Sequence, residues 1–533
     1  MEPRVLVRIF NVLNKARRRK IKVMFGFYDY QEEAFNKCQL NKKGIVVMPT
    51  GTGKTFVQAG VIANDILNNP GFRMYVINAP RIMLSYQLLE EVMKFNLNNG
   101  VDARYMAVHS GKLGEMVELQ KLRKEKGYKH AQINSTTSPR EVSEMITKAK
   151  EANQPLIFFS TYNSAIRIEE GRQEDPINII MNDEAHYLVQ ERFNTDFNEI
   201  ITERKYFFTA TMKKTPCDKG LGMNNTQFYG NEIFVMTPLQ AIQLGKIVRP
   251  RVHIVSTNGQ ELMTKEDLNV SLDKLVIDSF NEHSKLLKNG QKGKMLIAAS
   301  GTDDMKRLIK SNEIKNFVDN GGKFYAVASD SDISNFINGK KVARKEWLKQ
   351  LQIDGANKNQ KLIVIHYDIL TEGIDVPGLT GVLFLRNQSK SKFIQTYGRV
   401  ARLDKQDRNR ISSGKITPND LNQMNKPYAW IIIPALKRED DDKLANLEDL
   451  IDQLRDFGFD PSEDIEPRER AEGGSGKDDE EIVPEDNTIR RALGQMREEF
   501  EHNLELERVA NMSFKEVLSK NESILGSKDN FNF

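Results

Sequence analysis

Short, almost wholly apolar runs recur along the chain, and each is followed by a longer segment in which apolar residues keep helical spacing. A strand that is apolar at every position is buried on both faces, which is typical of a parallel sheet covered by helices. The runs fall into two successive sets, so the sequence predicts an α/β fold with two domains. The runs span residues 44–48, 74–78, 156–159, 177–181, 206–208, 295–298, 324–327, 362–365, 382–385 and 429–433.

The two predicted α/β domains span residues 25–240 and 241–435. We expect the segment 237–250 to be the hinge region between them, because it separates the two sets of apolar runs. Within the first domain, the polar and charge-rich segment 112–150 interrupts the alternation. We expect an inserted helical or loop segment there.

Both ends of the chain differ in composition from the two domains. Residues 1–24 are rich in arginine and lysine, with apolar residues at helical spacing among them. This pattern predicts a basic N-terminal helix, and a transit segment is the alternative. Residues 436–533 begin as an acidic linker with a Gly-Gly-Ser-Gly stretch and end in helical periodicity. This helical tail either packs on the second domain or docks a protein partner.

Composition excludes several classes of protein. Cys38 and Cys217 are the only cysteines, which rules out a disulfide framework and a four-cysteine zinc site. No apolar run approaches the roughly 20 residues of a membrane span, so we expect no membrane. The two cysteines and the lack of a secretory signal predict an intracellular, cytoplasmic location. The net charge of +4 is too small to imply a partner, and any binding of nucleic acid has to use local basic groups.

The most specific motif lies directly after the first apolar run, where the chain reads Gly-Ile-Val-Val-Met-Pro-Thr-Gly-Thr-Gly-Lys-Thr. Glycines let such a loop curl so that backbone N–H groups point at phosphate oxygens, and the following helix adds its positive N-terminus. Lys54 is expected to reach the β- and γ-phosphates, and the Thr55 hydroxyl to ligate Mg²⁺. The loop residues expected to hold the phosphates are Gly51, Thr52 and Gly53.

A pair of carboxylates follows another apolar run, in the sequence Met-Asn-Asp-Glu-Ala-His. Acids at the carboxyl end of a strand lie where α/β sheets place their chemistry. Phosphoryl transfer requires chiefly positioning and neutralisation of charge. We therefore expect Asp183 to hold Mg²⁺ and Glu184 to orient the attacking water.

In this order, these motifs resemble those of superfamily 2 helicases of the Asp-Glu-Ala-His type. Within that group the similarity is to the type III restriction-like helicase family, and the compact chain is similar to phage or viral members. The resemblance covers residues 25–434 and implies two tandem RecA-like domains with parallel sheets, ATP and Mg²⁺ as cofactors, and host cytoplasm as the location for a phage protein. Met48 stands where the strict phosphate-loop pattern has glycine, a replacement that the helicase pattern tolerates.

The resemblance assigns further contacts to ATP. Gln31 matches the residue that reads the adenine edge, and either Phe27 or Tyr28 stacks on the ring. Gly373 and Asp375, in the sequence Leu-Thr-Glu-Gly-Ile-Asp-Val-Pro, are expected near the ribose and the phosphates.

The resemblance also implies catalytic arginines and a set of coupling residues. Arg399 and Arg402 lie three residues apart on an expected helix, so they share one face and are candidates to reach the γ-phosphate across an interdomain cleft. The residues expected to couple hydrolysis to nucleic-acid binding are Thr209, Thr211 and Gln395.

Contacts to nucleic acid are expected to be mostly to phosphates, which fix position without reading sequence. The candidates by resemblance are Arg81, Thr161 and Ser300, and Arg386, Lys390 and Lys392 are either additional charges or solvated surface. The resemblance favours DNA over RNA, although the group contains members that act on RNA.

The resemblance implies an ATP-dependent nucleic-acid helicase or translocase that works in replication, recombination or repair of DNA. One alternative is the motor subunit of a restriction or defence complex, whose nuclease a partner supplies, and another is an RNA helicase. A protein that only binds partners on an inactive motor scaffold is expected to have lost Lys54, Glu184 or Arg402, and all of them are present.

Overall fold

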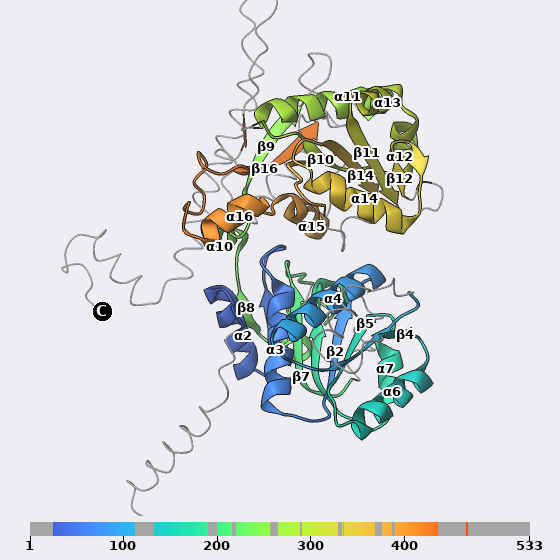
Figure 1. Ribbon diagram of the computed structural model, residues 1–533, viewed down its shortest axis with the longest axis vertical. Coiled ribbons are helices and arrows are strands. Elements are labelled where there is room, and N and C mark those ends of the chain that lie inside the picture. Colours follow the sequence, from blue (N-terminus) through green and yellow to red (C-terminus); the bar gives the residue numbers. More distant parts are fainter. Residues whose placement is uncertain are drawn as a thin grey trace, which may run out of the picture. The chain divides into compact units, whose positions relative to one another are not determined.

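The computed structural model shows two compact units (Figure 1). The first unit reaches Ala241 and the second begins at Ile242, while the segment Ile394–Arg402 groups with the first unit. This segment was expected to belong to the second domain, residues 241–435, and it groups with the first unit instead. The residues that the structure describes are 25–111, 133–189, 200–215, 220–255, 265–287, 290–328, 333, 335–367, 376–385, 390–434 and 465–466.

Several expectations fall outside these residues: the basic N-terminal helix, the helical tail with its protein partner, Gly373 and Asp375. No helix among the described residues combines the length and the apolar character that a membrane span requires.

The first unit contains an eight-stranded sheet in the order β4-β3-β5-β2-β6-β7-β1-β8, and every neighbouring pair is parallel. Its strands are β1 (Lys43–Val47), β2 (Met74–Ala79), β3 (Arg104–Val108), β4 (Asn134–Thr136), β5 (Leu156–Thr161), β6 (Ile177–Asn182), β7 (Thr202–Thr209) and β8 (Glu232–Val235).

The central strands β2, β5 and β6 are buried at every residue, so both faces of this part of the sheet are covered. Figure 1 shows α2, α3 and α4 packed beside one another against the sheet. The helices of this unit are α2 (Asp29–Leu40), α3 (Lys54–Asn68), α4 (Ile82–Asn98), α6 (Pro139–Glu151), α7 (Ala165–Arg172), the 3₁₀ helix η1 (Ala185–Val189), α9 (Thr226–Tyr229) and α10 (Pro238–Gln243).

The second unit contains a nine-stranded sheet in the order β13-β12-β11-β14-β10-β15-β16-β9-β17. All pairs are parallel except β11–β12 and β12–β13. Its strands are β9 (Arg249–Val255), β10 (Lys294–Ala298), β11 (Gly322–Ala328), β12 (Phe336–Ile337), β13 (Lys340–Lys341), β14 (Lys361–Tyr367), β15 (Gly381–Phe384), β16 (Tyr428–Pro434) and β17 (Ile465–Glu466).

Helices connect the parallel strands of this second sheet as well. Figure 1 shows α11 and α13 along one side of the sheet and α14 along the other. The helices of this unit are α11 (Lys265–Leu286), α12 (Thr302–Lys310), α13 (Asn312–Asp319), α14 (Arg344–Ala356), α15 (Lys390–Val400) and α16 (Lys405–Ser412). The second half of α15 belongs to the segment that groups with the first unit.

Each of the predicted apolar runs is a strand, and the α/β fold with parallel sheets is confirmed. Seven of the described strands were not predicted, namely β3, β4, β8, β9, β12, β13 and β17; those at the sheet edges are short or partly exposed. One of them, Asn134–Thr136, pairs with β3 inside the segment that was expected to be an insertion. The expected hinge region contains α10 and the first residues of β9.

A buried ionic cluster ties α3 to the sheet of the first unit. The Asp65 carboxylate accepts hydrogen bonds from Tyr75 Oη at 2.8 Å and from Arg73 Nε at 2.7 Å. Arg204 forms a further ion pair with the same carboxylate. Because both arginines are largely buried, the carboxylate compensates charges that water reaches poorly.

We expect Asp65→Ala to lower the free energy of unfolding by about 3 kcal/mol, because removal of one partner leaves buried positive charge uncompensated. Urea unfolding followed by circular dichroism measures this change. Glu90→Ala is the control, since it removes an exposed partner of Lys94 and should stay within about 1 kcal/mol of the wild type. An equally small effect of both substitutions would contradict the claim that Asp65 compensates buried positive charge.

Candidate functional site

The phosphate loop occupies the connection between β1 and α3. Gly51 and Gly53 have φ angles of +88° and +86°, a left-handed conformation that favours glycine. A Cβ atom on Gly53 would lie 2.4 Å from Gln31 Nε2, so a side chain does not fit there. Gly53 precedes α3 without a side-chain cap, which leaves the first N–H groups of the helix available to an anion.

Two side chains of α2 hold the loop in place. Tyr30 Oη donates to the Thr52 carbonyl at 2.8 Å, and Gln31 Nε2 donates to the same oxygen at 2.9 Å. The Thr52 hydroxyl donates to the Pro49 carbonyl at 2.7 Å. Gln31 was predicted as a site residue, whereas the role of Tyr30 was not, because a tyrosine beside the glutamine carries no distinctive signal.

The two aromatic candidates for adenine stacking have different surroundings. Phe27 packs over the backbone of α3, since a Cβ on Gly60 would lie 2.3 Å from Phe27 Cζ. Tyr28 is 43% exposed, and its ring stacks on Tyr30 with centroids 5.9 Å apart. Of the two rings, that of Tyr28 is the more exposed to solvent.

Lys54 is buried at the first position of α3, and its Nζ donates to the Met48 carbonyl at 3.2 Å. The side chain thus folds back over the loop, where the amino group can meet a bound phosphate. Thr55 follows it and is half-buried.

The predicted carboxylates follow β6, as expected. Asp183 is buried, and its Oδ1 accepts a hydrogen bond from Gln58 Nε2 at 2.8 Å. Burial, and then repulsion from Glu184, raise the pKa of Asp183 to about 7, although Lys54 and Gln58 act in the opposite direction. Glu184 has a φ of +49°, which is uncommon for a residue with a side chain.

This environment fits a divalent cation, because a positive charge at Asp183 would favour the ionised carboxylate that burial disfavours. No group of three or more acidic, histidine or cysteine side chains is suited to hold a metal among the described residues. Mg²⁺ does not require such a group, since it commonly binds through one or two carboxylates, water and substrate phosphates. Asp183 and Thr55 are the residues that would hold it.

A chain of hydrogen bonds runs from the carboxylate motif through His186. Its Nδ1 lies 3.1 Å from Thr209 Oγ1 and 3.5 Å from Glu184 Oε2, and its Nε2 lies 3.2 Å from Gln395 Nε2. An amide nitrogen can only donate, so Nε2 of the imidazole accepts and the proton is assigned to Nδ1. Burial lowers the pKa of His186, which favours this neutral form.

Thr209 continues the chain, because its hydroxyl donates to the Thr211 carbonyl at 2.7 Å. The structure therefore brings together all three of the residues that were expected to act in coupling. His186 was quoted in the motif but received no role, and Gln58 was missed because a single glutamine inside a helix gives no signal.

The segment that carries the two arginines packs against the phosphate loop. A Cβ on Gly398 would lie 2.7 Å from Thr50 Cβ, so glycine permits this close approach. Arg399 is 7% exposed on α15. Arg402 lies two residues beyond the end of that helix, so the expectation that both arginines share a helix face is wrong.

The residues expected to contact nucleic acid are divided between the two units. Arg81 is exposed at the start of α4, and Thr161, which ends β5, is paired in register with Ala79 of β2. These two therefore lie at the same edge of the first sheet. Ser300 belongs to the second unit, and its hydroxyl already donates to the Asp304 carboxylate. Arg386 lies outside the described residues.

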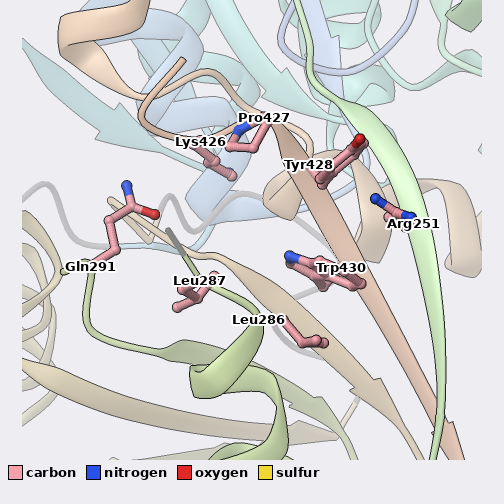
Figure 2. A pocket seen from close by; sticks show the side chains of 8 residues that line it. All are labelled: Arg251, Leu286, Leu287, Gln291, Lys426, Pro427, Tyr428 and Trp430. Carbon is pink, nitrogen blue, oxygen red and sulfur yellow. The ribbon is translucent and has the colours of Figure 1, made fainter. Parts of the chain in front are cut away.

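A separate pocket lies on the second unit at the amino ends of β9 and β16 (Figure 2). It encloses about 430 Å³ of space, including its opening to solvent. The guanidinium of Arg251 lies 4.7 Å from the Tyr428 ring centre and 5.7 Å from that of Trp430. None of the predicted site residues lines this pocket; its lining is Arg251, Leu286, Leu287, Gln291, Lys426, Pro427, Tyr428 and Trp430.

Comparison with protein families identifies one domain. Residues 24–214 match the family described as the res subunit of type III restriction enzymes, ResIII. None of the curated proteins matches the chain in sequence.

Solved structures with a similar fold include two restriction-modification enzymes of type ISP. One is the ATP-dependent enzyme LlaBIII bound to DNA, with a TM-score of 0.55, 19% identity and coverage of 80% of this chain and 29% of that chain. The other is a nuclease-deletion mutant of LlaGI in complex with a DNA substrate mimic, with a TM-score of 0.50, 18% identity and coverage of 81% and 29%.

The present chain therefore spans less than a third of the length of either enzyme. Its strand order, its phosphate loop and these comparisons lead to the same assignment. The chain has a RecA-like α/β fold, and residues 24–214 are similar to the ResIII domain of type III restriction res subunits.

Proposed function

We propose that this protein is a motor that hydrolyses ATP with Mg²⁺ to move along DNA or to unwind it. The observation that carries the proposal is the arrangement within the first unit. An anion-binding loop, a buried carboxylate pair and a hydrogen-bonded chain to Gln395 converge at the carboxyl ends of parallel strands. Each part serves phosphoryl transfer. Together they connect the site of the reacting phosphate to Gln395, which is distant in the sequence.

The phosphates of ATP bind to the curled loop and to the N-terminus of α3, where Lys54 neutralises their charge. Adenine contacts Gln31 and the exposed ring of Tyr28. Mg²⁺, when bound, neutralises charge that develops on the phosphates during transfer. Asp183 and Thr55 would hold this ion, and Glu184 would position the water that attacks the γ-phosphate.

His186 connects the nucleotide site to other segments of the protein. Its imidazole lies beside Glu184 and contacts both Thr209 and Gln395, so loss of the γ-phosphate can alter the position of a residue on α15. Arg399 and Arg402 stabilise the charge on the transferred phosphate, a contribution that reaches roughly 10³- to 10⁵-fold in related nucleotide hydrolases. Alternate gripping of a strand by the two units then moves the protein.

The similarity to LlaBIII, an ATP-dependent restriction-modification enzyme whose structure is bound to DNA, supports DNA as the track. The same comparison supports a second candidate function, the motor of a restriction complex whose other activities reside elsewhere. An RNA track is the remaining alternative, because the site described here reads phosphates and not sugars.

Steady-state ATP hydrolysis tests the proposal when it is measured alone and with single-stranded DNA, duplex DNA, branched DNA and RNA of matched length. We expect DNA to stimulate hydrolysis strongly, and Glu184→Gln to abolish most of the rate with nucleotide binding retained. If RNA alone stimulates hydrolysis, RNA and not DNA is the track. If no polymer stimulates hydrolysis, the motor proposal is overturned.

Arg402→Ala separates binding from catalysis. We expect ATP affinity close to that of the wild type and a fall in turnover of about 10²-fold or more, because the arginine acts on charge that develops in the transition state. Fluorescent-nucleotide binding and single-turnover hydrolysis measure the two quantities. The comparison variant is Lys54→Ala, which should lose affinity as well as turnover. Equal loss of both quantities in Arg402→Ala would show that this arginine is structural.

A further inference from the structure

Three polar side chains form a continuous ladder through the centre of the first sheet. Ser160 Oγ on β5 lies 3.0 Å from Asn78 Oδ1 on β2 and 2.8 Å from the Thr161 carbonyl, so its one hydrogen has two acceptors. Asn78 Nδ2 donates to Asn182 Oδ1 on β6 at 3.0 Å. Asn182 Nδ2 lies 3.3 Å from the Tyr206 carbonyl on β7. We call Ser160, Asn78 and Asn182 the polar ladder; each is 0% exposed.

The ladder occupies positions where apolar side chains would be the simpler choice. Its neighbours along the strands, Ile77, Phe159 and Met181, are fully buried apolar residues. A buried polar group costs free energy unless it is hydrogen-bonded, and a satisfied network fixes its members in one arrangement. The ladder therefore holds the ends of β5, β2 and β6 in a defined relation to one another.

A second connection lies directly beside it. Tyr162 Oη donates to the Asp183 carbonyl at 2.5 Å, and the Tyr162 backbone N–H donates to the Ala79 carbonyl at 3.0 Å. The Asp183 N–H donates to the Asn78 carbonyl at 2.8 Å. Backbone and side chains thus join the same three strand ends.

Each strand end leads into a segment that the proposed function uses. Ser160 precedes Thr161, and Asn78 lies three residues before Arg81, so two members adjoin the candidate contacts to nucleic acid. Asn182 precedes Asp183, the candidate metal ligand. Tyr162 and the ladder therefore connect the Thr161 segment to Asp183.

We propose that Tyr162 and the polar ladder are positioning residues that couple nucleic-acid binding at the Thr161 segment to the placement of the Asp183 carboxylate. The inference rests on the proposed function and deepens it. Coupling of this kind is reciprocal for binding: nucleic acid changes the affinity for nucleotide by the same factor by which nucleotide changes the affinity for nucleic acid. That factor can be measured without hydrolysis.

The test compares the DNA dissociation constant with and without a non-hydrolysable ATP analogue and Mg²⁺, for the wild type and for Tyr162→Phe. Ordinary coupling corresponds to a factor of about 5 to 150 between the two dissociation constants in the wild type. We expect Tyr162→Phe to bring this factor toward 1, while its affinities for DNA alone and for the analogue alone stay close to those of the wild type. An unchanged factor would overturn the inference.

Tyr75→Phe is the matched control. It also removes one buried tyrosine hydroxyl from the first unit, since Tyr75 Oη donates to Asp65 at the other end of β2. A general loss of stability would affect both variants alike. We expect Tyr75→Phe to keep the wild-type coupling factor, and an equal decrease in both variants would overturn the specific role of Tyr162.

The double substitution Asn78→Leu/Asn182→Leu tests the ladder separately. Replacing both partners by apolar groups of similar shape avoids a single unpaired amide, so folding is better retained than in either single variant. Circular dichroism and thermal unfolding establish the fold before coupling is measured. We expect the coupling factor to fall toward 1 again, and a folded double variant with wild-type coupling would remove the ladder from the inference.

The wild-type result keeps the two proposals distinct. DNA-stimulated hydrolysis in the wild type tests the motor, whereas the ratio of variant to wild-type coupling tests Tyr162 and the ladder. A wild type that hydrolyses ATP faster with DNA, together with a Tyr162→Phe variant of unchanged coupling, would leave the motor in place and overturn only the inference.

Discussion

The buried carboxylate of Asp183 is the group around which the first unit is arranged. A charge in this position is costly to bury, and the neighbouring Glu184 increases the cost. The compensating groups are Lys54 and Gln58 of α3. The Tyr162 hydroxyl, from the residue after β5, fixes the backbone beside them by donating to the Asp183 carbonyl. Because parallel strands end at one edge, segments far apart in sequence can meet at this carboxylate. In our proposal, a cation and the phosphates of ATP complete its environment.

Much of this arrangement could be predicted from the sequence. The apolar runs identified the central strands, and the phosphate loop together with the Asp-Glu pair indicated the edge of the sheet where the site lies. Tyr30, Gln58, Tyr162 and the polar ladder could not be found in this way, because their roles depend on contacts between elements that no local pattern encodes. The edge strands were missed for a related reason, since they have a polar or exposed side that breaks the apolar run. Arg402 shows the limit of spacing arguments, because the helix ends before it.

The second unit repeats the parallel α/β architecture but carries a different set of polar features. Its pocket beside Arg251, Tyr428 and Trp430 lies at the amino ends of its strands, whereas Ser300 follows the carboxyl end of β10. The two features therefore occupy opposite edges of that sheet. The similarity to type ISP restriction-modification enzymes concerns the fold, and the chain corresponds to only 29% of each of those proteins. The proposed function therefore rests on the residues of the site and not on these relatives.

Movement along DNA is the central claim, and a length series measures it most directly. A fluorophore is placed at one end of DNA of increasing length, ATP is added to bound protein in a stopped-flow instrument, and the time until the signal changes is recorded. A motor predicts a delay that grows linearly with the length of the DNA and is absent in Lys54→Ala. A delay that does not depend on length, with ATP hydrolysis intact, would contradict translocation and leave an ATPase that acts in place.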